Sequence, residues 1–276
     1  MKISKNKNIR KAVLWLLRKF NPGNIKIKHP FTGDKFLLDV YMHKGYWFKG
    51  KSVEKRTMEL FRLLISEGDI VVEIGGHIGF MTVYFSHLTG NNGSVYVFEP
   101  ASNNLPFLKT NISLQKKHNI VLIEKAISDT EGVAVFYMEK ITGQNNSLIQ
   151  DHLGPYSHKN LKDESLKFIQ HVETITLDNF ISEKKINQIN FVKIDIEGAE
   201  LMALNGMKNM LNKFKPRIML EVSRDQEEIF HCLTTLGYVI FDTEKNQLNK
   251  IEYQNIFGVH RSDVMLHKLN LQNLPN

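Results

Sequence analysis

The chain has little cysteine and no long apolar run. Cys232 is the one cysteine in 276 residues, which excludes an internal disulfide framework and favours a reducing compartment such as the cytoplasm. No apolar run approaches the roughly 18–20 residues that cross a bilayer. Residues 12–17 are apolar, but they fall short of the roughly 7–15 residues of a signal-peptide core. With 42% hydrophobic residues, the chain is expected to form one soluble, enzyme-sized domain.

Acidic residues are absent from the start of the chain, where the first is Asp34. Residues 1–67 hold 16 Lys or Arg against 5 Asp or Glu, a net of +11. The remaining residues hold 20 against 24, a net of −4. Within the basic segment, apolar residues recur at helical spacing at Ile9, Val13, Leu16, Leu17 and Phe20. The sequence therefore predicts a basic amphipathic helix in this segment.

Two interpretations of residues 1–20 are open. The helix either attaches peripherally to the inner face of an anionic membrane, or packs on the domain's own core with a solvated basic face. The second interpretation is the more ordinary one. Nucleic acid is not expected as a partner, because a basic arm without interleaved aromatic residues is weak evidence for it.

The most informative motif, at residues 69–80, is a buried strand that ends in Glu73 and runs into a glycine-rich turn with Gly75, Gly76 and Gly79. A helix follows, and its N-terminus offers free N–H groups to a ligand. A second strand, at 94–98, ends in Glu99, twenty residues after Gly79. An acid in that place accepts hydrogen bonds from both hydroxyls of a ribose. The pattern predicts a nucleoside-type cofactor across the strand ends.

The glycine spacing indicates which cofactor. A dinucleotide site requires G-x-G-x-x-G, but His77 and Phe80 stand where the second and third glycines would fall. A nicotinamide-dependent oxidoreductase is therefore the weaker alternative. Glu73 suits a cationic α-amino acid group instead, which favours S-adenosylmethionine. A tight turn without any ligand is the remaining alternative.

A second acidic motif follows a strand predicted at 189–194. Asp195 and Glu197 lie at its end, and Glu221 lies at the end of the next strand, at 217–222. Because these strand ends share one edge of a parallel sheet, the three carboxylates are expected in the same crevice. There they could remove a proton from a substrate hydroxyl or hold a divalent metal ion. The alternative is N-capping of the helix predicted at 198–211, with Glu200 on that helix's surface.

Strand and helix patterns alternate along the chain, which predicts an α/β fold with a mainly parallel sheet covered on both faces. Three segments are expected: a basic segment at 1–52, a main domain at 53–262 and a tail at 263–276. Residues 139–170 are polar and irregular, typical of an inserted lid or substrate loop. Residues 126–132 are predicted as a turn.

Five pieces of the sequence together resemble the FkbM family of methyltransferases. They are V-V-E-I-G-G-H-I-G-F, V-F-E-P, K-A-I-S-D-T-E-G, T-L-D-N-F and V-K-I-D-I-E-G-A-E, in the family's order, across residues 53–262. The resemblance implies a Rossmann-like class I methyltransferase fold, with a seven-stranded sheet whose last strand is antiparallel. It implies S-adenosylmethionine as methyl donor and a hydroxyl acceptor on a sugar or other small molecule. The family motif has Asn where this chain has His77, so the role of that residue stays open.

Carried over residue by residue, the resemblance assigns Glu73, Gly75 and Gly76 to the methionyl end of the donor, and Glu99 to the ribose. It assigns Ala126 and Ile127 to the adenine face, and Asp195 to the methyl-transfer point with Glu197 and Glu221 behind it. A non-catalytic donor-binding domain and a membrane-recruited domain remain alternatives. The acceptor, metal dependence and oligomeric state stay open.

Overall fold

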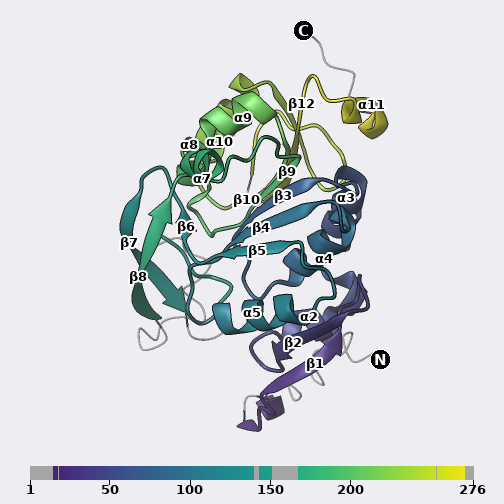
Figure 1. The fold of residues 1–276 in the computed structure, drawn as a ribbon, viewed down its shortest axis with the longest axis vertical. Helices are drawn as coiled ribbons and strands as arrows, with labels where there is room; N and C mark the ends of the chain where they lie inside the picture. The colour runs from purple at the N-terminus through teal and green to yellow at the C-terminus, as the bar shows by residue number, and fades with distance from the viewer. Residues whose placement is uncertain (1–14, 18, 140–142, 151–166, 253, 271–276) are drawn as a thin grey trace.

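A seven-stranded sheet forms the centre of the molecule (Figure 1). The computed structural model describes residues 15–17, 19–139, 143–150, 167–252 and 254–270. The strand order is β11-β12-β10-β9-β3-β4-β5. The strands are β3 (Ile70–Ile74), β4 (Ser94–Phe98), β5 (Ile120–Ile123), β9 (Phe191–Ile194), β10 (Arg217–Val222), β11 (Tyr238–Phe241) and β12 (Gln254–His260). β12 is antiparallel to both of its neighbours and the other pairs are parallel, so the predicted fold is confirmed.

Helices cover both faces of this sheet (Figure 1). One face packs against α7 (Leu177–Glu183), α8 (Glu200–Asn205), α9 (Lys208–Phe214) and α10 (Gln226–Thr235). The other packs against α3 (Lys55–Leu64), α4 (Phe80–Thr89) and α11 (Met265–Leu269). α5 (Leu105–Ser113) follows β4. None of the described helices is long and apolar enough to cross a membrane.

Burial on both faces explains why the central strands read as continuous apolar runs. In the register of β3 with β9, Val71 is paired with Phe191, and both face the α3–α4 side. The next pair, Val72 with Val192, faces the α7–α10 side. The side chains of the central strands therefore lie in an apolar environment on either face. A charged side chain there needs a specific partner that compensates its charge.

Two smaller sheets flank the large one (Figure 1). A hairpin of β1 (Asn24–Lys28) and β2 (Lys35–Asp39) precedes α2 (Lys44–Lys49) and a short 3-10 helix (Gly50–Ser52). A three-stranded sheet is ordered β6-β8-β7, with β6 (Ala126–Ile127), β7 (Gly132–Glu139) and β8 (Lys167–Ile175). The prediction of a turn at 126–132 is therefore wrong for its first two residues, because they form β6 and pair with β8.

The segments on either side of the predicted 53–262 domain share its core. Phe36 and Leu38 of β2 are fully buried in the same cluster as α3 and α4. Met265, Leu266 and Leu269 of α11 join that cluster from the tail. The predicted lid at 139–170 lies partly outside the described residues, at 140–142 and 151–166. Its ends belong to β7 and β8.

The single helix predicted at 198–211 is two helices, α8 and α9, with Gly206 between them. A Cβ on Gly206 would overlap the backbone carbonyl oxygen of Ser128, so the chain needs glycine at this close approach. The carboxylate of Asp178 then accepts hydrogen bonds from Asn209 N (3.0 Å) and Met210 N (2.8 Å) at the start of α9. These contacts explain the break.

We expect Gly206→Ala to lower the free energy of unfolding by about 1–3 kcal/mol, because the added methyl forces two backbone segments apart. Denaturant unfolding of the full chain measures this change. Gly45→Ala is the matched control: nothing lies near its Cβ, and alanine is the better helix former, so stability should be kept or raised. Equal stability of the two variants would contradict the packing account.

Candidate functional site

A cavity of about 320 Å³ lies at the carboxyl ends of β3, β4, β9 and β10. The sequence-predicted site residues that line it are Glu73, Gly75, Gly76, Glu99, Ala126, Ile127, Asp195, Glu197 and Glu221. Gly79 is outside this lining and instead begins α4 with φ +88°. Ala126 and Ile127 reach the cavity from β6, and residues 143–146 and Leu148 form part of its wall. The structure thus brings together nine of the ten residues singled out from the sequence.

The glycines of the turn make room for neighbouring protein atoms. A Cβ on Gly75, whose φ is +86°, would overlap the carbonyl oxygen of Asp195. A Cβ on Gly76 would overlap the side chain of Val97, and one on Gly79 would lie 2.8 Å from Leu108. The missing side chains therefore let the β3 turn pack against β4, β9 and α5. The backbone of Gly75 and Gly76 still lines the cavity.

Glu99 ties this turn to the end of β4. Its Oε2 accepts from His77 N at 2.6 Å, and its Oε1 accepts from Ala101 N at 2.9 Å and Asn104 Nδ2 at 3.4 Å. Burial raises the pKa of Glu99 to about 7, although these hydrogen bonds act in the opposite direction. Each carboxylate oxygen has two lone-pair positions, so a further hydroxyl donor can be accepted from the cavity.

Lys193 was not singled out from the sequence, yet it is the buried cation of the site. The β3–β9 register pairs it with Glu73. Its Nζ donates to Gly75 O at 2.8 Å and lies 3.1 Å from Asp195 Oδ2 and 3.9 Å from Glu73 Oε1. Burial alone would lower the pKa of Lys193, but Asp195 and Glu73 outweigh it and raise the pKa. The signal that could have found it is a lysine inside the buried strand β9.

Glu73 faces this ammonium from within the core. Its Oε2 accepts a hydrogen bond from Thr82 Oγ1 at 2.6 Å. Burial raises the pKa of Glu73 to about 7, against the charge of Lys193 and the Thr82 hydrogen bond. The carboxyl group therefore exchanges a proton near neutral pH.

Further carboxylates gather around Asp195. The charge of Asp195, followed by burial, raises the pKa of Glu221. Burial, followed by the charge of Asp195, raises the pKa of Glu197. The same two causes raise the pKa of Glu54, which precedes α3 and also lines the cavity. No sequence pattern marks Glu54 as a site residue, because tertiary packing alone brings it to this cluster.

Neither Asp195 nor Glu197, in the turn after β9, caps the helix that follows. The N-cap of α8 is Ala199, and no side chain caps it. The Oε1 of Glu200 instead accepts from Gly198 N at 3.0 Å and Ile196 N at 3.3 Å. Glu200 is fully buried, so its expected place on the helix surface is wrong. This internal bracing holds Glu197 in a left-handed conformation with φ 55°.

The N-terminal segment supplies one wall of the cavity. Tyr46 of α2 lines it, and its ring packs against Phe80 with centroids 4.5 Å apart. The Tyr46 hydroxyl lies 3.2 Å from His77 Nδ1. His77 thus contacts α2 through its ring and Glu99 through its backbone N–H. This residue, which differs from the Asn of the family motif, therefore helps to hold the turn in place.

No group of three or more His, Cys, Asp or Glu side chains is arranged to hold a metal ion, within the ranges of the chain that the structure describes. The carboxylates around Asp195 share a cavity without the convergent geometry of a metal site. The metal interpretation of these residues therefore has no support from their arrangement.

We expect Lys193→Met to lower the free energy of unfolding by about 3–5 kcal/mol near pH 8, because it leaves buried carboxylates without their counter-charge. The loss should be smaller near pH 5.5, since carboxyl groups with raised pKa values are then protonated. Denaturant unfolding at both pH values measures the difference. Lys116→Met, at an exposed lysine, is the control. An equal loss at both pH values would contradict the electrostatic role.

Comparison with known proteins identifies the family of the chain. The model of the methyltransferase FkbM domain family matches residues 73–251. Methyltransferase 1 of Beauveria bassiana is 20% identical over 148 residues, which are 51% of this chain and 59% of that protein. Hexuronic acid methyltransferase AglP of Haloferax volcanii is 25% identical over 198 residues, which are 70% of this chain and 73% of that protein.

A crystal structure of methyltransferase FkbM from Methylobacillus flagellatus is similar with a TM-score of 0.45 and 13% identity. That similarity covers 91% of this chain and 59% of the other. The chain thus spans less than two thirds of the Beauveria and Methylobacillus proteins. The family model nevertheless covers more than half of the chain, including Glu73, Glu99, Asp195 and Glu221. The chain therefore belongs to the FkbM methyltransferase family.

Proposed function

We propose that the chain is an S-adenosylmethionine-dependent methyltransferase that methylates a hydroxyl of a sugar, glycan or related small molecule. The observation that carries the proposal is the charge of the cavity. Its lining has six carboxylates, from Glu54, Glu73, Glu99, Asp195, Glu197 and Glu221, against two lysines, Lys125 and Lys193. Such a lining attracts cations, and the donor carries both a sulfonium and an ammonium group.

The residues of the cavity fit the parts of this donor. Glu99 is at the end of β4, and its Oε2, which accepts one hydrogen bond from the protein, has acceptor capacity left for a ribose hydroxyl. Ala126 and Ile127 offer buried apolar side chains to the adenine. Glu73 and the backbone of Gly75 would hold the methionyl ammonium. When bound, the donor supplies a methyl group already activated by the positive sulfur.

Asp195 is the proposed acceptor of the proton that the substrate hydroxyl loses. As the hydroxyl oxygen bonds to the methyl carbon and the sulfur–carbon bond breaks, Asp195 would accept the hydroxyl proton. Lys193, 3.1 Å from Asp195 Oδ2, orients that carboxylate. Glu197 and Glu221 lie in the same lining, where burial and the charge of Asp195 raise their pKa values and favour their protonated forms.

A hydroxyl-rich acceptor suits the remaining wall. Gln144 and Asn145 add amide groups to the lining, which pair readily with hydroxyl donors and acceptors. The Haloferax relative is named a hexuronic acid methyltransferase, and a hexuronic acid is a sugar acid. That name supports a carbohydrate as the acceptor class. Segment 143–150 would close this side of the cavity and limit the access of water.

The nicotinamide-dependent alternative is opposed by the same lining. A dinucleotide carries a pyrophosphate, and six carboxylates repel it. The turn also has His77 and Phe80 where a dinucleotide fingerprint requires its second and third glycines.

We expect Asp195→Asn to lower turnover about 10²–10⁴-fold, because the nearly isosteric amide cannot accept the hydroxyl proton. Donor affinity and melting temperature should change little, since the amide oxygen can still accept a hydrogen bond from Lys193. Transfer of labelled methyl groups to a panel of sugars and glycosides measures turnover, and calorimetry measures donor binding.

Asp129→Asn, at an exposed aspartate outside the cavity, is the matched control and should keep full turnover. Near-normal turnover of Asp195→Asn would remove that residue from the reaction. Failure of the unmodified chain to methylate any hydroxyl in the panel, despite binding the donor, would contradict hydroxyl methylation.

A further inference from the structure

Large apolar side chains are exposed where the N-terminal segment enters the fold. Trp15 is 61%, Leu16 48% and Phe20 65% exposed. Lys19 stands between the two rings, with its Nζ 5.4 Å from the centroid of each. Trp15, Leu16, Lys19 and Phe20 form what we call the aromatic patch. Leu16 and Phe20, which belong to the predicted amphipathic helix, are thus not packed on the domain's core, while residues 1–14 of that prediction lie outside the described residues.

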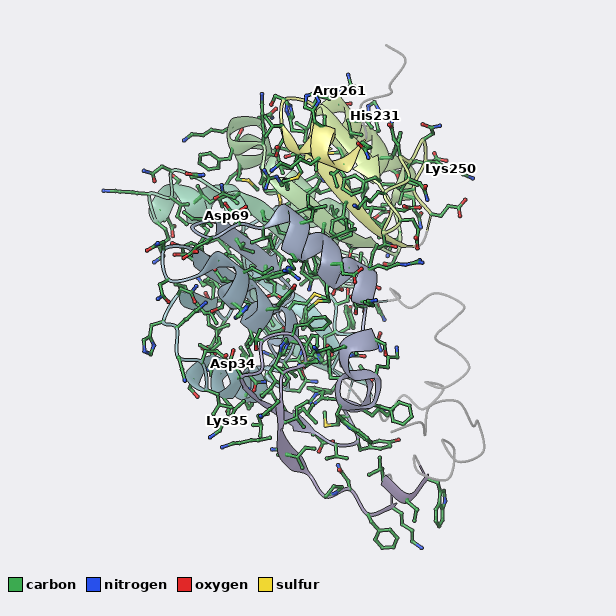
Figure 2. All side chains as sticks on the ribbon, turned by 90° about the vertical axis from the view of Figure 1, so that its right-hand side faces the viewer. Asp34, Lys35, Asp69, His231, Lys250 and Arg261 are labelled. Carbon is green, nitrogen blue, oxygen red and sulfur yellow. The ribbon has the colours of Figure 1, made fainter. Side chains whose placement is uncertain are left out.

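The hairpin that follows has one basic face. Alternation along β1 turns Ile25 and Ile27 toward the core and leaves Lys26 and Lys28 exposed. Lys35 of β2 lies directly across from Lys28, so two like charges face each other. Such a pair is destabilising unless anions are nearby. Figure 2 shows Lys35 at the outer edge of the lower part of the molecule, beside Asp34.

The sequence around these elements strengthens the charge. The first 33 residues contain nine Lys or Arg and no Asp or Glu. Among the residues that the structure describes, none of Lys19, Lys26, Lys28 and Lys35 forms a salt bridge. Their charge is therefore available to an external anionic surface.

We propose that the aromatic patch and the basic face of the β1–β2 hairpin bind the surface of an anionic phospholipid bilayer. Aromatic and aliphatic side chains insert at the level of the lipid headgroups, and lysines beside them contact the lipid phosphates. Leu16 and Phe20 have no polar group to offer another partner, which favours a lipid surface over a nucleic acid. This attachment is independent of the reaction in the cavity.

Vesicle sedimentation of the full chain tests the proposal. We expect binding to phosphatidylcholine vesicles with about 30% phosphatidylglycerol to be at least about tenfold tighter than to phosphatidylcholine alone, and to weaken as salt is raised. Trp15→Ser/Phe20→Ser should weaken binding about tenfold or more, because the inserted apolar area is lost. Lys26→Ala/Lys28→Ala should weaken it roughly 25-fold, at about fivefold for each lysine.

Matched controls come from other parts of the surface. Val133→Ser/Ile169→Ser removes two apolar side chains that are 70% and 59% exposed on β7 and β8. Lys250→Ala/Lys268→Ala removes two lysines, and Figure 2 shows Lys250 at the opposite end of the molecule from Lys35. Both controls should bind vesicles as the unmodified chain does, and melting temperatures confirm that all variants fold.

Three results would overturn the proposal. The first is equally weak binding of the unmodified chain to both kinds of vesicle. The second is a loss of vesicle binding in the control variants that is as large as the loss in the Trp15/Phe20 and Lys26/Lys28 variants. The third is retention by heparin or duplex RNA without vesicle binding, which would show that the basic face serves a soluble polyanion.

Discussion

The ammonium of Lys193 lies between Asp195, Glu73 and the carbonyl of Gly75, inside a strand that is otherwise apolar. This arrangement joins the two strands whose ends form the centre of the site. It fixes the turn after β3 through the Gly75 carbonyl, and it sets the orientation of Asp195. Removing the cation would leave several carboxylates in a low-dielectric environment, which proteins tolerate only with bound protons or a replacement cation.

The charge balance of the cavity follows from this constraint. One buried lysine cannot neutralise the carboxylates around it, so burial and mutual repulsion raise the pKa values of Glu54, Glu73, Glu99, Glu197 and Glu221. The carboxyl groups of the cavity therefore bind protons near neutral pH. A cationic donor would replace those protons, which links binding of the donor to the state in which Asp195 can act as a base.

The fold and the strand-end acids could be predicted because each depends on a local pattern. Strand β4 ends before Glu99 and β9 before Asp195, and in a parallel sheet both ends meet at one edge. Lys193 was missed although it lies in an apolar run, and strand periodicity does not show which carboxylates would compensate a buried lysine. Glu54 and Tyr46 arrive by tertiary packing of segments outside the family's motifs. The glycines were recognised, but their missing side chains make room for protein atoms that the sequence cannot show.

Calorimetry with S-adenosylmethionine and S-adenosylhomocysteine tests the central claim most directly, because the two ligands differ by one methyl group and the sulfonium charge. The account predicts that S-adenosylmethionine binding releases protons near pH 7, seen as an enthalpy that depends on the ionisation enthalpy of the buffer. Its affinity should rise between about pH 6 and pH 8, and more steeply than that of S-adenosylhomocysteine. Binding of both ligands with the same pH dependence and no proton release would contradict the account.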